Sequence, residues 1–160
     1  DLDLRPVEGT DGKSSEEEIL LKLEKFGIRP QSVTLWGTGS PLREFLWSED
    51  MADASVHVLL NVDFKDTYEA GAKEVRNCHI NIGTGKELTI RQLSEKIRET
   101  VGFKGDILWD STKPDGTMRK LTDPSKLHSL GWHHKVEIEE GVRRLYEWYL
   151  KGICINHFTK

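Results

Sequence analysis

The feature that most constrains the fold is the alternation of short strand-like runs with helices that carry clear start and stop signals. The clearest helix begins at Thr89, has Gln92 three residues on, keeps its apolar residues on one face and ends at Gly102. Short apolar runs predict strands at residues 32–36, 43–47, 77–82 and 106–110. Strands that alternate with helices predict an α/β fold, and runs this short predict a small sheet.

Four other helices are predicted on the same grounds, at residues 14–27, 48–61, 123–131 and 138–152. Ser14 or Ser15 is the expected cap of the first helix, Ser48 that of the second and Asp123 that of the third. The second helix is expected to face inward with Met51, Ala54, Val58 and Leu59.

The composition excludes several classes of protein. With a net charge of −4, the chain lacks the excess of basic residues that is typical of general nucleic-acid binders. Any recognition of phosphate must therefore depend on a local group of cations. No apolar run reaches the length of a membrane span, and the first residues lack the pattern of a signal peptide. Cys78 and Cys154 show no metal or redox spacing, which favours a reduced, cytoplasmic setting. The opening on a Pro/Gly/Asp-rich stretch without Met is typical of a fragment of a longer polypeptide.

The usual motifs of cofactor and catalytic sites are missing from the sequence. Neither glycine fingerprint of a dinucleotide-binding loop occurs, and no Tyr is followed by Lys four residues later. His128, His133 and His134 lack the Cys or acid that would complete a zinc set. We therefore expect no catalytic, cofactor-binding or metal-binding residue within these 160 residues.

Two stretches remain as candidates for chemistry, and the first is the segment around the GTGSP turn at residues 37–41. A well-fixed Arg43 after this turn suits bidentate contact with a diphosphate, and Trp36 before it suits packing on a sugar or a base. The alternative is that Trp36 lies in the core and that Arg43 pairs with Glu44 or Asp50.

The second candidate stretch is the loop STKPDGTMRKL, residues 111–121, which holds three cations against one acid in a chain that is acidic overall. Lys113, Arg119 and Lys120 are suited to phosphate, and the Asp115 carboxylate is suited to ribose hydroxyls or a guanine edge. The alternative is a solvated turn whose charges bind nothing.

Four stretches together resemble a known family: VTLWGTGSPLREFLWSEDMADA, HINIGTGKELTIRQLSEKI, the segment from Val101 to Trp132, and EEGVRRLYEWYL. In this order they are similar to the C-terminal part of the GDP-L-fucose synthase family, a branch of the extended short-chain dehydrogenase/reductases. The similarity runs from about Ser32 to Gly152. REFL and INIGTG are typical of the extended family at large, whereas KPDGTMRKL is typical of this branch.

The resemblance implies the small C-terminal substrate-binding domain of such an enzyme, with the Rossmann half absent. Trp36, Arg43, Asp115 and Lys120 would then contact the GDP-sugar, with Arg119 a lesser candidate and Cys78 without a catalytic role. NADP(H) would be bound by the missing N-terminal half, and the complete enzyme would be a homodimer. That enzyme would invert C3 and C5 of GDP-4-keto-6-deoxy-D-mannose and reduce its C4 ketone. The fragment alone would be inactive.

The first 31 residues of this sequence depart from the family pattern. Residues 1–31 are interpreted as an acidic helical insertion or linker, residues 32–152 as the sugar-nucleotide-binding domain and residues 153–160 as a tail. Two alternatives stay open: another sugar-nucleotide epimerase or dehydratase of the same superfamily, and a non-catalytic binding module built on this fold. Preference for GDP over UDP distinguishes the GDP-L-fucose synthase family from the other epimerases and dehydratases. The presence of an upstream Tyr-x-x-x-Lys distinguishes an enzyme from a non-catalytic binding module.

Overall fold

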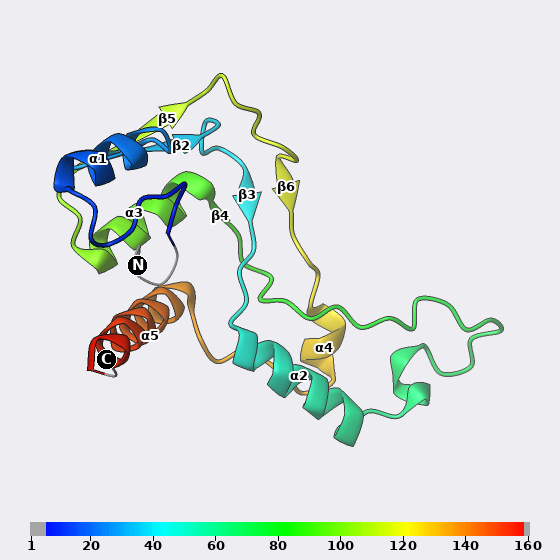
Figure 1. The fold of residues 1–160 in the computed structure, drawn as a ribbon. Helices are drawn as coiled ribbons and strands as arrows, with labels where there is room; N and C mark the ends of the chain where they lie inside the picture. Colours follow the sequence, from blue (N-terminus) through cyan, green and yellow to red (C-terminus); the bar gives the residue numbers. More distant parts are fainter. Residues whose placement is uncertain (1–5, 159–160) are drawn as a thin grey trace.

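The computed structural model describes the backbone of residues 6–158 and the side chains of residues 6–152. It confirms a mixed α/β fold, in which short strands form two small sheets (Figure 1). In the first sheet, β1 (Ile28–Arg29) pairs antiparallel with β2 (Ser32–Trp36), and β2 runs parallel to β5 (Asp106–Asp110). The strands predicted at residues 32–36 and 106–110 are therefore confirmed.

The second sheet joins three strands of two residues each. β3 (Leu42–Arg43) lies at its centre, antiparallel to β4 (Leu88–Thr89) and parallel to β6 (Arg119–Lys120). Only Arg43 of the strand expected at 43–47 belongs to it, because the chain turns toward the next helix after that residue. The strand expected at 77–82 is wrong as well: this segment has no strand partner in the described part of the chain.

The helices are α1 (Glu16–Glu24), α2 (Ser48–Asn61), α3 (Ile90–Val101), α4 (Ser125–Ser129) and α5 (Ile138–Phe158), with a short 3-10 helix at Phe64–Thr67. Capping boxes at Ser15 and Thr89 confirm two of the predicted starts. Ser48 is not the cap of α2 but its first helical residue, and Trp47 precedes it without a capping bond. At α4, Asp123 accepts a hydrogen bond from the backbone N–H of Ser125.

The core of the described chain is small and lies where α2 meets α4. Ala54, Leu127 and Trp132 are buried there, and four half-buried residues pack against them: Leu46, Val58, Ile80 and Ile82. The inward orientation of Ala54 is thus confirmed. The inward orientation of Met51 and Leu59 is wrong, since their side chains are 43% and 81% exposed.

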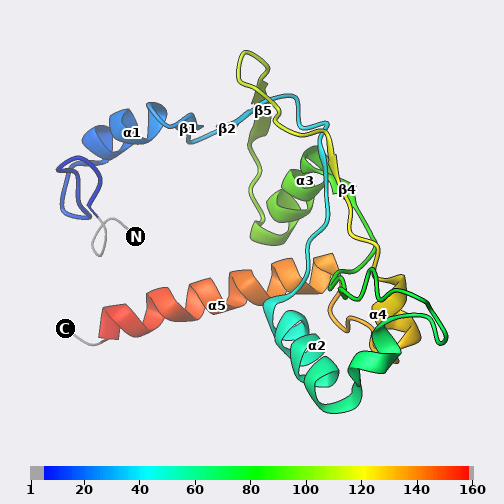
Figure 2. The same cartoon turned by 90° about the vertical axis from the view of Figure 1, so that its right-hand side faces the viewer.

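Helices α3 and α5 stack beneath the first sheet. Figure 2 shows α3 between β5 and the first turns of α5. An ion pair from Lys96 to Glu139, 2.5 Å long, joins the two helices. This stack fixes the N-terminus of α3, on which the GTGSP turn rests.

Candidate site for a phosphate-bearing ligand

The GTGSP turn is fastened to the N-terminus of α3. The carbonyls of Gly39 and Pro41 accept hydrogen bonds from the backbone N–H groups of Arg91 and Ile90, at 2.9 and 3.0 Å. Gly39 has a φ of +74°, and a Cβ there would lie 2.5 Å from the Trp109 ring. The turn therefore needs glycine for both its backbone conformation and its close approach to that ring. It holds the ends of β2 and β3 in fixed places.

Asp115 binds the same turn through hydrogen bonds from Thr38. Its Oδ1 accepts from the Thr38 N–H and its Oδ2 from the Thr38 hydroxyl, both at 2.7 Å. The hydrogen bonds from Thr38 hold the pKa of Asp115 below its usual range. A Cβ on Gly37 would lie 2.3 Å from Oδ1. Asp115 thus ties the 111–121 loop to the turn, a contact that the sequence analysis did not anticipate.

Replacing Asp115 by Ala is expected to release the loop from the turn. The Thr38 N–H and hydroxyl then lose their charged acceptor, so the melting temperature should fall near neutral pH. Because the folded-state pKa of Asp115 is lowered, its contribution is present above the unfolded-state pKa and is lost as the pH falls toward the folded-state value. Melting curves between pH 7 and pH 3 test this. An Asp115→Ala protein that melts at the same temperature as the original at pH 7 would contradict it.

Arg43 and Lys120 lie side by side in the second sheet. In the parallel pairing of β3 with β6, Arg43 stands in register with Lys120 and Leu42 with Arg119. Residues in register on neighbouring strands point to the same face of a sheet, so the two cations share one face. The two candidates that are 77 positions apart in the sequence are therefore brought together by the fold.

The expected acidic partners of Arg43 are engaged elsewhere. Glu44 accepts from backbone groups at residues 84, 85 and 122, and Asp50 accepts from the N–H groups of Lys135 and Val136. The Arg43 guanidinium donates to the Leu42 carbonyl at 2.7 Å, and no ion pair among the described side chains includes it. The alternative of an Arg43–Glu44 or Arg43–Asp50 pair is wrong.

Arg119 differs from Lys120 in its partner. Its guanidinium makes two contacts with the Glu87 carboxylate, at 2.8 and 3.0 Å. The hydrogen bond and charge of Glu87 raise the pKa of Arg119. Arg119, paired with Glu87 on the opposite face, is less available to an anion than Lys120, for which no ion pair is found among the described side chains.

Trp36 lies at the exposed end of β2, not in the core. Its side chain is 75% exposed, which makes the core alternative wrong. The ammonium of Lys113 stands 5.5 Å from the centre of its ring, within the range of a cation–π contact. An exposed indole beside a cation offers a flat face on which a base or a sugar ring can pack.

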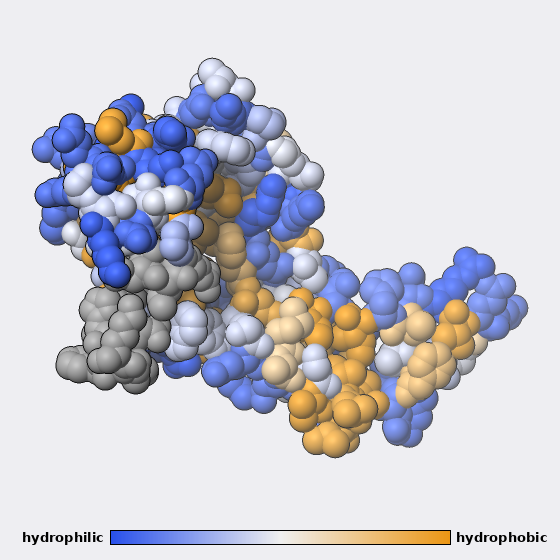
Figure 3. All heavy atoms as spheres, in the orientation of Figure 1, coloured by the Kyte–Doolittle hydropathy of each residue, from blue (hydrophilic) through white to orange (hydrophobic). Residues whose placement is uncertain are grey.

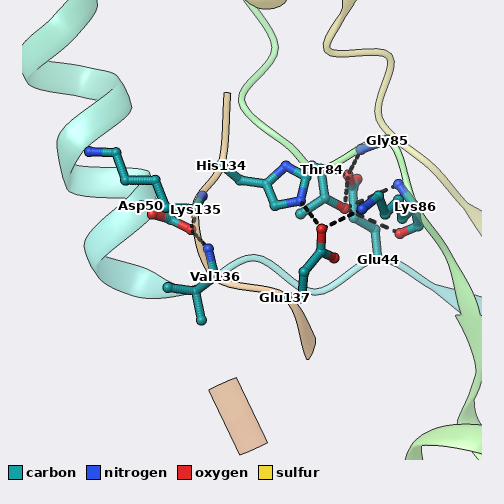
Figure 4. A network of polar contacts seen from close by, with 9 residues as sticks. All are labelled: Glu44, Asp50, Thr84, Gly85, Lys86, His134, Lys135, Val136 and Glu137. Carbon is teal, nitrogen blue, oxygen red and sulfur yellow. Dashed lines mark hydrogen bonds and ion pairs between the residues drawn. The ribbon is translucent and has the colours of Figure 1, made fainter. Parts of the chain in front are cut away.

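Glu44 lies beside the candidate site, and the sequence analysis considered it only as a possible partner of Arg43. Its Oε1 accepts from the N–H groups of Thr84 and Gly85 at 2.5 and 2.7 Å (Figure 4). Its Oε2 accepts from the Thr122 N–H at 3.0 Å. Burial raises the pKa of Glu44, but hydrogen bonds from Thr122, Gly85 and Thr84 outweigh it and leave the pKa lowered. The carboxylate thereby joins β3 to the turn at 83–85 and to the segment after Lys120.

The acids of α2 fasten the segment that leads to α5. The carboxylate of Asp50, 3% exposed, accepts from the N–H groups of Lys135 and Val136 (Figure 4). Asp53 accepts from the Trp132 indole at 2.8 Å and from the Lys135 ammonium at 2.9 Å. Both acids are therefore structural in the described chain.

The turn at 37–41 does not have the form of a dinucleotide-binding loop. The turn at 37–41 leads into a strand and not into a helix, so it lacks the helix N-terminus on which a pyrophosphate rests. The His128 and His133 rings stack at 4.2 Å, and no group of three His, Cys, Asp or Glu that would hold a metal ion is found among the described residues. Within the same residues no helix has the length and apolarity to cross a membrane.

Comparisons with known proteins agree on one family. A sequence profile described as "NAD dependent epimerase/dehydratase family" matches residues 9–83. GDP-L-fucose synthase 1 of Arabidopsis thaliana is 52% identical over 124 residues, which are 78% of this chain and 35% of that protein. GDP-L-fucose synthase of Escherichia coli (strain K12) is 44% identical over 122 residues, 75% of this chain and 36% of that protein.

A solved structure agrees as well. The crystal structure of a GDP-6-OMe-4-keto-L-xylo-heptose reductase from C. jejuni aligns with a TM-score of 0.80 at 42% identity, over 87% of this chain and 39% of that one. The chain spans about a third of the length of the curated relatives it matches. Over most of its length it is similar to the GDP-L-fucose synthases, and residues 9–83 match the NAD-dependent epimerase/dehydratase family.

Proposed function

We propose that this chain is the sugar-nucleotide-binding part of a GDP-L-fucose synthase, which converts GDP-4-keto-6-deoxy-D-mannose to GDP-L-fucose by 3,5-epimerisation and 4-keto reduction. The observation that carries the proposal is the pair of cations Arg43 and Lys120 on one face of the second sheet, with Glu44 and Asp50, the acids considered as partners of Arg43, engaged elsewhere. The similarity to GDP-L-fucose synthases supports it.

In the proposed binding mode, Arg43 and Lys120 hold the diphosphate and Trp36 packs on the base or a sugar. Arg43 can meet two phosphate oxygens at once through its planar guanidinium, while Lys120 supplies a point charge. Asp115 keeps the two loops together, and each of its oxygens retains a lone pair for a ribose hydroxyl. Binding of the remote diphosphate then orients the sugar for reaction.

The proposal divides the chain as the sequence suggested. Residues 32–152 form the binding domain, residues 1–31 an acidic insertion or linker, and residues 153–160 a tail. Because the turn at 37–41 does not have the form of a dinucleotide-binding loop, we assign NADP(H) and the catalytic groups to a Rossmann part outside this sequence. The 160 residues alone should therefore be inactive, and the complete protein is proposed to be a cytoplasmic homodimer that binds neither nucleic acid nor membranes.

Titration calorimetry with GDP-L-fucose and with UDP-glucose tests the binding proposal. We expect heat of binding from the GDP-sugar and at least tenfold weaker binding of the UDP-sugar. Equal or stronger binding of UDP-glucose would favour another sugar-nucleotide epimerase or dehydratase. A non-catalytic binding module is favoured if the encoding gene carries no upstream Tyr-x-x-x-Lys.

Replacing Trp36 by Ala should separate binding from stability. Because the side chain is 75% exposed, its loss should leave the melting temperature within about 1–2 °C. The affinity for GDP-L-fucose should fall severalfold, since stacking on an aromatic ring contributes about 1 kcal/mol or more. Unchanged affinity would remove Trp36 from the proposed site.

A further inference from the structure

The sequence holds two Asp-Gly pairs that share their chemistry but not their surroundings. Asp11–Gly12 lies in the loop before α1, and Asp115–Gly116 lies in the loop before β6. Both aspartates are half-buried, and both glycines are exposed. A glycine has no Cβ to shield its backbone nitrogen, so this nitrogen can reach the side chain of the preceding aspartate. The two pairs therefore have comparable intrinsic reactivity, and the fold decides how each one behaves.

The reaction open to an Asp-Gly pair is spontaneous isomerisation through a succinimide. The glycine nitrogen attacks Cγ of the aspartic acid; an N–C bond forms, a C–O bond breaks, and the N–H proton leaves with the hydroxyl group as water. Water then opens the ring at either carbonyl. Opening at Cγ restores aspartate, whereas opening at the backbone carbonyl gives isoaspartate, in which the chain continues through Cβ and Cγ. The reaction requires a neutral carboxyl group that is free to turn toward the nitrogen.

The carboxyl group of Asp115 is held by a distant part of the chain. Its two oxygens accept from the N–H and the hydroxyl of Thr38, and Thr38 is fixed in turn because its carbonyl accepts from the Arg91 guanidinium at 2.6 Å. One of these two oxygens must be protonated and leave during the reaction, so a hydrogen bond from Thr38 is lost whichever oxygen departs. The same hydrogen bonds keep the pKa of Asp115 below its usual range, which makes the neutral form scarce.

The carboxyl group of Asp11 has only local contacts. Among the described residues, it accepts a single hydrogen bond, from the Lys13 N–H to Oδ1 at 2.8 Å. A bond to the second residue along the chain folds the carboxyl group back over its own backbone, where the Gly12 nitrogen lies. The other hydrogen bonds of Asp11 join it to Ser14. Gly12 is exposed, and hydrophilic residues predominate on the surface around α1, the helix that follows (Figure 3).

We propose that Asp11–Gly12 is a site of spontaneous isoaspartate formation, and that the hydrogen bonds from Thr38 withhold Asp115–Gly116 from the same reaction. Isoaspartate at position 115 would add one backbone atom to the loop and move the carboxylate away from Thr38. The protection therefore preserves the tie between the 111–121 loop and the GTGSP turn. The inference is independent of the proposed function, because both rates are properties of the chain without a ligand.

Incubation of the chain at physiological temperature tests the proposal, with peptide mapping by electron-transfer mass spectrometry to distinguish isoaspartate from aspartate. Isoaspartate should form at least about tenfold faster at position 11 than at position 115, since reaction at 115 costs hydrogen bonds to a charged group. In concentrated urea, where the fold no longer holds Asp115, the two rates should agree within about threefold. Equal rates in the folded chain, or a difference that persists in urea, would overturn the proposal.

Two threonine variants separate the effect of Thr38 from that of the loop. Thr38→Val removes the hydroxyl that bonds to Asp115, whereas Thr112→Val removes a hydroxyl that bonds to Asp110 at 2.5 Å in the same loop. The first variant should raise the rate at position 115 at least about threefold, and the second should leave it unchanged. Neither should alter the rate at position 11. An unchanged rate at position 115 in Thr38→Val would contradict the proposal. The comparison of the two pairs within the original chain decides the matter even where a variant does not fold.

Discussion

Arg43→Ala is expected to weaken the binding of GDP-L-fucose at least tenfold, a loss of about 1.4 kcal/mol or more. The reason is geometric: the guanidinium is held at the end of a turn fastened to α3, and its expected acidic partners, Glu44 and Asp50, bond to backbone groups instead. Titration calorimetry of the chain with GDP-L-fucose measures the change, and the same variant in the complete enzyme should raise KM by a similar factor.

Two other variants make this result specific. Lys120→Ala removes the neighbouring cation on the same face and should weaken binding as well, whereas Arg119→Ala removes a cation already paired with Glu87. The Arg119 variant should therefore change affinity less than threefold, although its net charge changes by the same amount. Equal losses in all three variants would indicate general attraction between charges and not a defined diphosphate site. Unchanged affinity in Arg43→Ala would remove Arg43 from the site.

The local part of the fold could be predicted from the sequence, because its signals are short in range. The capping boxes at Ser15 and Thr89 depend on residues within four positions, and both appear as expected. The segment at 77–82 shows the limit. Ile80 and Ile82 pack against the core, but a strand needs a partner, and the apolar pattern alone does not identify one.

For the candidate site as well, the sequence identifies single residues but not the contacts between them. Arg43 and Lys120 were chosen for their charge and resemblance, and their adjacency depends on a strand register that no local signal encodes. The contact of Asp115 with Thr38, 77 positions away, and the contacts of Glu44 across 40 and 78 positions are long-range as well. Glu44, the acid next to Arg43, is one of the two partners that the sequence allows as an alternative, whereas the fold directs this acid toward three backbone N–H groups.

Glu44→Gln is expected to destabilise the folded chain by about 2 kcal/mol and to weaken the binding of the GDP-sugar. A carboxylate accepts from N–H groups through both oxygens, but a Gln amide has one oxygen and turns an NH₂ toward either Thr122 or the 83–85 turn. At least one N–H group then loses its acceptor, and β3, which carries Arg43, loses its tie to the segment that follows Lys120. Chemical denaturation gives the free energy of unfolding, and calorimetry gives the affinity.

The dependence on pH distinguishes this role from simple loss of packing. The folded-state pKa of Glu44 lies below its ordinary value of 4.5, so its charge stabilises the fold above that pH and the stabilisation is lost as the pH falls toward the folded-state pKa. The difference in unfolding free energy between the original chain and Glu44→Gln should therefore be largest at pH 6–7 and shrink below about pH 4.5. Glu17→Gln, at an exposed position on α1, should show no such difference. A Gln variant whose deficit is the same at pH 4 and pH 7 would mean that shape, and not charge, is what Glu44 contributes.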